Sequence, residues 1–206
     1  MNTTLDSLLE NPEKTMTAII KRIATGPELS KSVSSEEARA GMLLLLDGLA
    51  DPVQSAVFLI GLRGKRETED ENKGVLQAIL DRTKIIEAEV DEVVDIADPY
   101  NGYSRSLPSS PFLAALLAES GVLAVSHGIE TIAPKFGVTH SQILAAAGVS
   151  VNLPLEEMGK QISDPDIGWA YVDQSVFCPS LYALRGFRKR IVKRTAISTS
   201  EVLTGP

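Results

Sequence analysis

Helix-start signals recur at close intervals in the first part of the chain and leave little room there for anything except helices. Two of them are pairs in which Ser or Thr precedes Glu by three residues, the pattern of a capping box. The third combines an N-cap aspartate with a proline at the first helical position. The three signals are Ser34 with Glu37, Asp51 with Pro52, and Thr68 with Glu71. They predict helices over 34–48, 51–64 and 68–84, preceded by apolar residues at helical spacing between Leu5 and Ile23.

From about residue 90 the pattern changes to short β-branched runs that alternate with alanine- and leucine-rich segments. The candidate strands are 93–97, 122–126, 149–153 and 167–172, and the candidate helices are 109–120, 139–147, 155–162 and 180–193. Such alternation is typical of parallel strands joined by helical crossovers. The predicted fold class is therefore α/β. It comprises an all-helical domain over residues 1–88 and the first part of an α/β domain with a mainly parallel sheet over residues 89–206.

Composition narrows the classes of function. The net charge of −7 and the pI near 4.9 disfavour nucleic acid as a partner, because a polyanion is repelled by an acidic surface. The single Cys178 excludes an internal disulfide and favours a reducing compartment. Apolar runs are too short to span a membrane, and the first residues do not have the pattern of a signal peptide. We expect a soluble, cytoplasmic protein that has no membrane partner.

Several segments, in order, resemble the anthranilate phosphoribosyltransferase family. The run from "LSKSVSSEEARAG" to "LRGKRETEDE" is similar to that family's N-terminal helical domain, which ends in an "LRxKGETxEE"-like signature. "VVDIA" resembles the family's first strand, and "GVLAVSHG" resembles its "GVPVAKHGN" strand and loop. "CPSLYALRGFRKRIVKRT" is similar to its "HPAMKHVAPVRRELGIRT" helix. The resemblance covers essentially the whole chain but only the first part of a typical family member.

The resemblance implies a small helical domain joined to a larger α/β domain. Enzymes of the family transfer ribose 5-phosphate from phosphoribosyl pyrophosphate to an aromatic amine with magnesium, and a related branch binds DNA. The family's magnesium-binding acidic pair would lie beyond Pro206, so we expect no metal and no cofactor here, with magnesium only if the chain is a transferase. The resemblance also implies a homodimer formed by the N-terminal helices, for which Leu43–Leu46 and "AVFLIGL" are the candidate apolar stripes. A protein partner that covers the partial α/β domain is a further expectation.

The family's glycine-rich pyrophosphate loop, "GTGGD", falls on residues 98–102, which read Asp98, Pro99, Tyr100, Asn101 and Gly102. A pyrophosphate loop needs backbone N–H groups that closely approach an anion. Proline has no N–H, tyrosine is bulky, and aspartate adds charge of the ligand's own sign. Three interpretations stay open: an unusual pyrophosphate loop, a plain turn between strand and helix, or a stacking and cationic surface made of Tyr100, Tyr103 and Arg105.

The family's second phosphate loop falls on Ser126, His127 and Gly128, with Glu130 where the family prefers arginine. The turn residues are kept, but the positive charges are not. For His127 we favour a histidine satisfied by local backbone groups over a proton carrier. Lys135 remains at a family lysine position.

Arg188 falls on the arginine that contacts the aromatic acid in the biosynthetic enzymes. It belongs to the basic run "RGFRKRIVKR", in which helical spacing places Arg185, Arg188 or Lys189, and Lys193 on one face. We favour a solvated face, with an anion or nucleic-acid contact as the alternative.

Two hypotheses follow. The first is a phosphoribosyltransferase-fold protein with a degenerate pyrophosphate loop that acts as a non-catalytic binding or regulatory protein. The second is a divergent glycosyltransferase that uses phosphoribosyl pyrophosphate and an aromatic or nitrogenous acceptor. No catalytic residue is assigned. The candidate ligand-binding residues are Asp98, Tyr100, Asn101, Gly102, Arg105, Ser126, His127, Gly128, Lys135 and Arg188.

Overall fold

The computed structural model describes residues 4–26 and 28–206, and the chain divides into two compact units. The first unit contains the chain up to residue 82 together with residues 193–204, and the second contains residues 83–192 and 205–206. Residues 193–204, which the sequence assigned to the α/β domain, therefore group with the helical unit, where α12 (Ile197–Ser200) contacts α5 (Glu69–Leu80). Within the described ranges no helix is both long and apolar enough to cross a membrane.

The first unit is helical, as predicted, and its helices begin at the predicted caps. Ser34 and Thr68 form complete capping boxes with Glu37 and Glu71, and Asp51 caps a helix that starts at Pro52. Besides α5 and α12, the unit contains α1 (Leu5–Leu9), α2 (Pro12–Ile23), α3 (Ser35–Leu46), α4 (Pro52–Lys65) and η2 (Glu201–Leu203). The local signals thus determine where these helices start.

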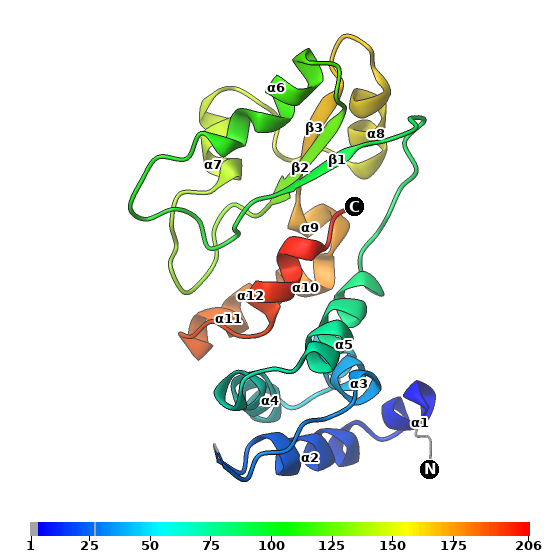
Figure 1. Cartoon of the computed structure of the whole chain (residues 1–206), viewed down its shortest axis with the longest axis vertical. Coiled ribbons are helices and arrows are strands. Elements are labelled where there is room, and N and C mark those ends of the chain that lie inside the picture. The colour runs from blue at the N-terminus through cyan, green and yellow to red at the C-terminus, as the bar shows by residue number, and fades with distance from the viewer. Residues whose placement is uncertain (1–3, 27) are drawn as a thin grey trace. The chain divides into compact units, whose positions relative to one another are not determined.

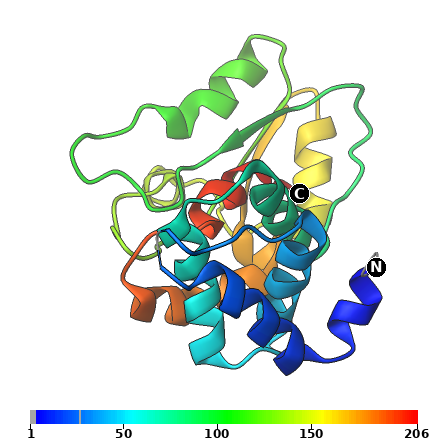
Figure 2. The ribbon, with the colours of Figure 1, turned by 60° about the horizontal axis from the view of Figure 1, so that its bottom comes forward.

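The core of this unit forms where α3 packs against α5 and α2 packs against α4 (Figures 1 and 2). Leu43–Leu46, a predicted dimer stripe, are buried inside the unit itself, so they are not available to a partner. Part of the second predicted stripe is exposed: Val57 and Ile60 of α4 lie on the surface together with Val53.

The second unit contains a parallel sheet in the order β1 (Val94–Ala97), β2 (Ala124–Gly128) and β3 (Trp169–Asp173). Helices α6 (Leu113–Glu119) and α8 (Leu155–Ser163) flank this sheet in Figure 1. Three of the four predicted strands are present, the second starting two residues later than expected. The predicted strand at 149–153 is wrong. This stretch is an irregular connection: Val149 and Val151 are half-buried and Leu153 is buried, but the described sheet contains only β1, β2 and β3, so 149–153 has no paired strand.

The other elements of the second unit are η1 (Ser110–Phe112), α7 (His140–Ala146), α9 (Gln174–Phe177), α10 (Pro179–Ala183) and α11 (Arg185–Ile191). The predicted helix over 180–193 is therefore two short helices, and it ends where Val192 adopts a left-handed backbone conformation with φ of 65°. The carboxyl ends of β1 and β2 lead into residues 98–103 and 129–138. We call these segments the first loop and the second loop.

Candidate functional site

The two loops pair with each other at the carboxyl end of the sheet. The N–H of Tyr103 donates to the carbonyl of Val138 and the N–H of Val138 donates back, both at 2.8 Å, and the Gly137 N–H donates to the Asn101 carbonyl at 3.0 Å. Gly102 has φ of +71°, and a Cβ there would overlap the Gly137 backbone. The predicted turn is present, and glycine is required because two backbones meet at that point.

Three backbone N–H groups of the first loop already donate hydrogen bonds within the protein. Asp98 donates its N–H to the His127 carbonyl at 2.8 Å, Asn101 to the Pro99 carbonyl at 2.5 Å, and Tyr103 to Val138. Pro99 has no N–H to offer. An anion at this loop would have to compete with existing hydrogen bonds for its donors.

Tyr100 points into the protein, contrary to the surface interpretation. Its side chain is fully buried, and its hydroxyl lies 2.8 Å from Nδ1 of His127. Tyr103 is half-buried and stacks on His140 with ring centroids 6.3 Å apart, whereas Arg105 is exposed. The proposed stacking surface of Tyr100, Tyr103 and Arg105 is therefore wrong, because the first of these rings is inside the fold.

His127 is fully buried and is held by side chains, not by local backbone groups as the sequence suggested. Besides Tyr100, Asp95 places Oδ1 2.9 Å from Nε2. This close approach does not meet the geometry of a hydrogen bond. Sequence reasoning missed Asp95 as a partner. The signal was strand alternation, since Asp95 pairs with Val125 and so shares a sheet face with His127.

Asp98 and Gly128 meet on the other sheet face. The Asp98 carboxyl group is buried and accepts a 2.7 Å hydrogen bond from the backbone N–H of His140. A Cβ on Gly128 would lie 2.7 Å from the Asp98 Cβ and 3.1 Å from the Tyr171 hydroxyl. Burial, followed by the nearby Asp173 carboxylate, raises the pKa of Tyr171, which keeps its phenol neutral. The absence of a side chain at Gly128 thus leaves room for Asp98.

His140 begins α7 behind the N-cap Thr139, as predicted, and it has a partner that the sequence did not reveal. Its Nε2 lies 2.8 Å from Oγ of Ser110, which in turn lies 3.1 Å from the Tyr103 hydroxyl. Burial, with a smaller contribution from His127, lowers the pKa of His140 to about 4. The imidazole is therefore neutral near pH 7.

This low pKa predicts an acid-sensitive stability. The unfolded chain takes up a proton on His140 below pH 6.5, whereas the folded chain does so only near pH 4. The stability contribution is complete above pH 6.5 and is lost as the pH falls to about 4, by about 2 kcal/mol after allowance for solvent screening. Urea unfolding of wild type and His140→Gln across this range measures it. An identical pH slope in both proteins would contradict the assignment.

The other candidate residues do not gather at one exposed site. Ser126 and Asn101 are buried, whereas Lys135 is exposed. Arg188 is only 4% exposed, so it does not belong to a solvated face, and Lys193 lies beyond the end of α11. Arg185 instead stacks over Tyr182, with its guanidinium carbon 3.6 Å from the ring centroid.

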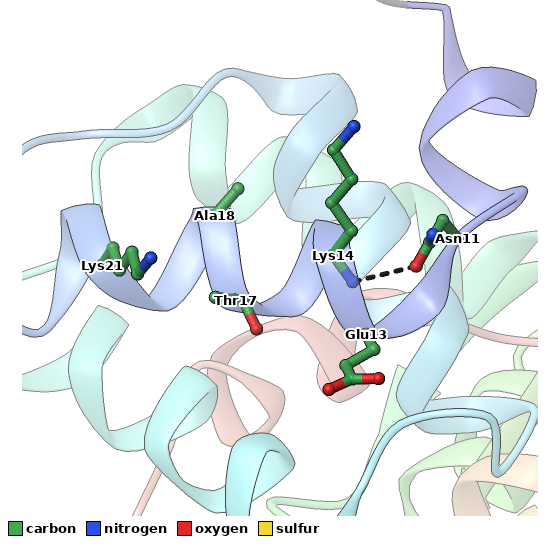
Figure 3. A pocket seen from close by; sticks show the side chains of 6 residues that line it. All are labelled: Asn11, Glu13, Lys14, Thr17, Ala18 and Lys21. Carbon is green, nitrogen blue, oxygen red and sulfur yellow. Dashed lines mark hydrogen bonds between the residues drawn. The ribbon is translucent and has the colours of Figure 1, made fainter.

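A hollow of about 450 Å³ lies in the helical unit, far along the chain from these loops. Figure 3 shows that its lining side chains extend from α2 and its cap, with Lys14 and Glu13 on opposite sides of the helix. The dashed bond is the N-cap contact from the Lys14 N–H to Asn11. These groups do not converge on one point, so the hollow is not a candidate site. In residues 4–26 and 28–206 no group of three or more His, Cys, Asp or Glu side chains is placed to hold a metal.

Comparisons with known proteins extend the resemblance. The helical bundle domain of the glycosyl transferase family matches residues 17–83. Anthranilate phosphoribosyltransferase from Saccharopolyspora erythraea is 30% identical over 92% of this chain and 51% of its own length. The Rhodococcus jostii enzyme is 28% identical over 95% of this chain and 51% of its own. The Thermus thermophilus structure superposes with a TM-score of 0.73 at 22% identity, covering 89% of this chain and 52% of that one.

The chain is a divergent relative of the anthranilate phosphoribosyltransferases. It spans about half the length of the curated relatives that it matches. A yeast anthranilate phosphoribosyltransferase, whose structure holds phosphoribosyl pyrophosphate and magnesium, shares the fold with a TM-score of 0.69 at 15% identity. In this anthranilate phosphoribosyltransferase relative, the first loop pairs with the second, and the side chain of Tyr100 is buried.

Proposed function

We propose that this chain is a phosphoribosyltransferase-fold binding or regulatory protein that does not bind phosphoribosyl pyrophosphate through its first and second loops. The observation that carries the proposal is the buried Tyr100, whose hydroxyl meets His127 of the segment leading into the second loop. The Tyr100 side chain therefore links the first loop to the strand that leads into the second loop. A ligand that needs both would have to displace it.

Charge supports the same proposal. Pyrophosphate is stabilised by N–H dipoles and by cations placed beside it. The first loop contributes the acidic Asp98, and the second begins with Ile129 and Glu130 where the resemblance leads one to expect a basic residue. Because three N–H donors of the first loop are already engaged, neither the dipoles nor the charges favour an anion here.

The alternative is a divergent glycosyltransferase that uses phosphoribosyl pyrophosphate and an aromatic or nitrogenous acceptor. The favouring observation is the 30% identity to an anthranilate phosphoribosyltransferase across 92% of this chain. On this alternative the first loop would rearrange on binding, and magnesium would be required.

Calorimetry with phosphoribosyl pyrophosphate and magnesium separates the two proposals. We expect no binding in the micromolar range to the wild-type chain, because the donors and charges of both loops are unsuited to the anion. The Saccharopolyspora erythraea enzyme is the positive control under the same conditions. Micromolar binding by this chain would overturn the proposal in favour of the transferase.

A loop-restored variant, with Gly-Thr-Gly-Gly at positions 98–101, tests whether the first loop alone is responsible. Gly102 is kept, because a side chain there would overlap the Gly137 backbone. We expect this variant still not to bind phosphoribosyl pyrophosphate in the micromolar range, since Ser126 of β2 and Glu130 of the second loop are unchanged. A strong gain would show that only the first loop prevents binding.

We also propose that the helical unit forms a homodimer through α4. Val53, Val57 and Ile60 are spaced four and three residues apart, and all are exposed on one helix face. Light scattering should give twice the chain mass, and a monomer would reject this proposal. We further propose that the α/β unit binds a protein partner, and light scattering of a mixture with that partner should show the added mass.

A further inference from the structure

The ring of Tyr100 is completely buried, and its backbone has an unfavourable conformation. Its φ is +52°, in the left-handed region that a bulky residue rarely adopts, and its side chain is 0% exposed. Such a conformation persists only where the surroundings determine it strongly. The space that receives the ring must therefore hold a hydroxyphenyl group well enough to keep the strained backbone in place.

The surroundings are themselves held in position. The Tyr100 hydroxyl lies 2.8 Å from Nδ1 of His127, and the two rings are 5.9 Å apart with a tilt of 60°. Phe177 meets the same imidazole edge-on at 5.5 Å, and Asp95 lies 2.9 Å from its other nitrogen. We call His127, Phe177 and Asp95 the phenol seat. Because Phe177 and Asp95 lie against the imidazole on its other sides, its Nδ1 faces the position of the hydroxyl group.

We propose that the phenol seat is a binding site for a small hydroxyphenyl ligand and that the chain's own Tyr100 occupies it in this structure. The ligand class is argued from the occupant, since the seat already holds a phenol with its ring buried and its hydroxyl paired. This inference rests on the proposed function, because a neutral phenol is expected only where the loops do not hold pyrophosphate. The strained backbone of Tyr100 favours release of the ring, so an external phenol competes with a tethered one.

The test uses the Tyr100→Gly variant, which vacates the seat and removes the backbone strain at that position. The probe is 4-fluorophenol, followed by fluorine NMR titration. We expect it to bind the variant at least about tenfold more tightly than wild type, because Tyr100 no longer competes. The matched probe 4-fluorotoluene lacks the hydroxyl and should bind the variant about tenfold more weakly than 4-fluorophenol. Equal affinity of the two probes, or of the two proteins, would overturn the proposal.

A second variant keeps the proposal testable if Tyr100→Gly does not fold. Tyr100→Phe keeps the ring and loses only the hydroxyl, and the chain contains just two histidines to resolve by nitrogen NMR. The Nδ1 resonance of His127 should shift while that of His140 stays, and Tyr182→Phe should move neither. An unshifted His127 resonance would show that the seat does not recognise the hydroxyl.

The two proposals fail in different measurements. Binding of phosphoribosyl pyrophosphate by wild type would overturn the proposed function and leave the probe affinities as the test of the seat. Equal binding of 4-fluorophenol and 4-fluorotoluene would remove the seat, whereas the pyrophosphate result would be unaffected.

Discussion

Replacing Glu71 with alanine is expected to lower the free energy of unfolding by about 3–5 kcal/mol. The Glu71 carboxylate is fully buried and joins three segments of the helical unit. It accepts hydrogen bonds from the Lys65 ammonium at 2.6 Å, the Thr68 N–H at 2.8 Å and the Val33 N–H at 2.9 Å. Alanine would leave the ammonium of Lys65, itself only 6% exposed, without its carboxylate and would orphan two backbone donors. Urea unfolding followed by circular dichroism measures the loss.

The charge state of Glu71 gives the same effect a pH dependence. Burial alone would raise the pKa of this carboxyl group, but Lys65 and the N–H groups of Thr68 and Val33 outweigh burial, so the pKa lies below the ordinary glutamate value of 4.5. The contribution is therefore complete above pH 4.5 and is lost as the pH falls through the folded value.

Glu69→Ala is the matched control, because Glu69 lies in the same first turn of α5 but is solvent-exposed beside Lys73. Its stability should stay close to that of wild type. If both alanine variants lost the same amount of stability, the three-way network at Glu71 would not be the cause.

Replacing Gly74 with alanine should lower the free energy of unfolding by about 3 kcal/mol through overpacking. Gly74 lies in α5 where this helix crosses closest to α3. A Cβ there would overlap the carbonyl oxygen of Ser35 and would lie 2.9 Å from both the Ala38 Cβ and the Arg39 nitrogen. Backbone atoms cannot move aside as a flexible side chain can, so the two helices must separate.

Replacing Gly64 with alanine should change the free energy of unfolding in the opposite direction. Gly64 lies inside α4, and a Cβ there would meet no atom within 4 Å. Alanine should raise the unfolding free energy by up to about 1 kcal/mol, because glycine is the poorer helix former. Thermal unfolding of the two variants gives the comparison, and a loss of stability in both would mean that helix packing is not what distinguishes them.

The likeness to anthranilate phosphoribosyltransferases and the proposed loss of pyrophosphate binding concern different parts of the molecule. The helical bundle match and the superposition describe where the helices and strands lie. The candidate site depends on what residues 98–103 and 129–138 do at the carboxyl end of that sheet. A fold kept in this way is compatible with a different ligand, since function resides in the site that the fold positions.

The sequence by itself determined the helix starts and the alternation of parallel strands with helices. Capping boxes at Ser34 and Thr68 are exchanges between residues three apart, so their outcome depends little on distant parts of the chain. Strand 93–97 was placed within one residue for a similar reason, because Val93, Val94 and Ile96 locally favour an extended backbone. The stretch 149–153 has the same local appearance and is no strand, since pairing needs a neighbour that the sequence pattern does not identify.

Only the tertiary structure decided what the candidate site residues do. The turn at residues 98–102 was predictable from its Asp, Pro, Asn and Gly, but the direction of Tyr100 was not, because it depends on whether His127, 27 residues later, offers a partner. Arg188 similarly reads as part of a basic face and is buried by its surroundings. Local chemistry sets the path of the backbone, whereas the contacts between segments distant in sequence select which side chains point inward.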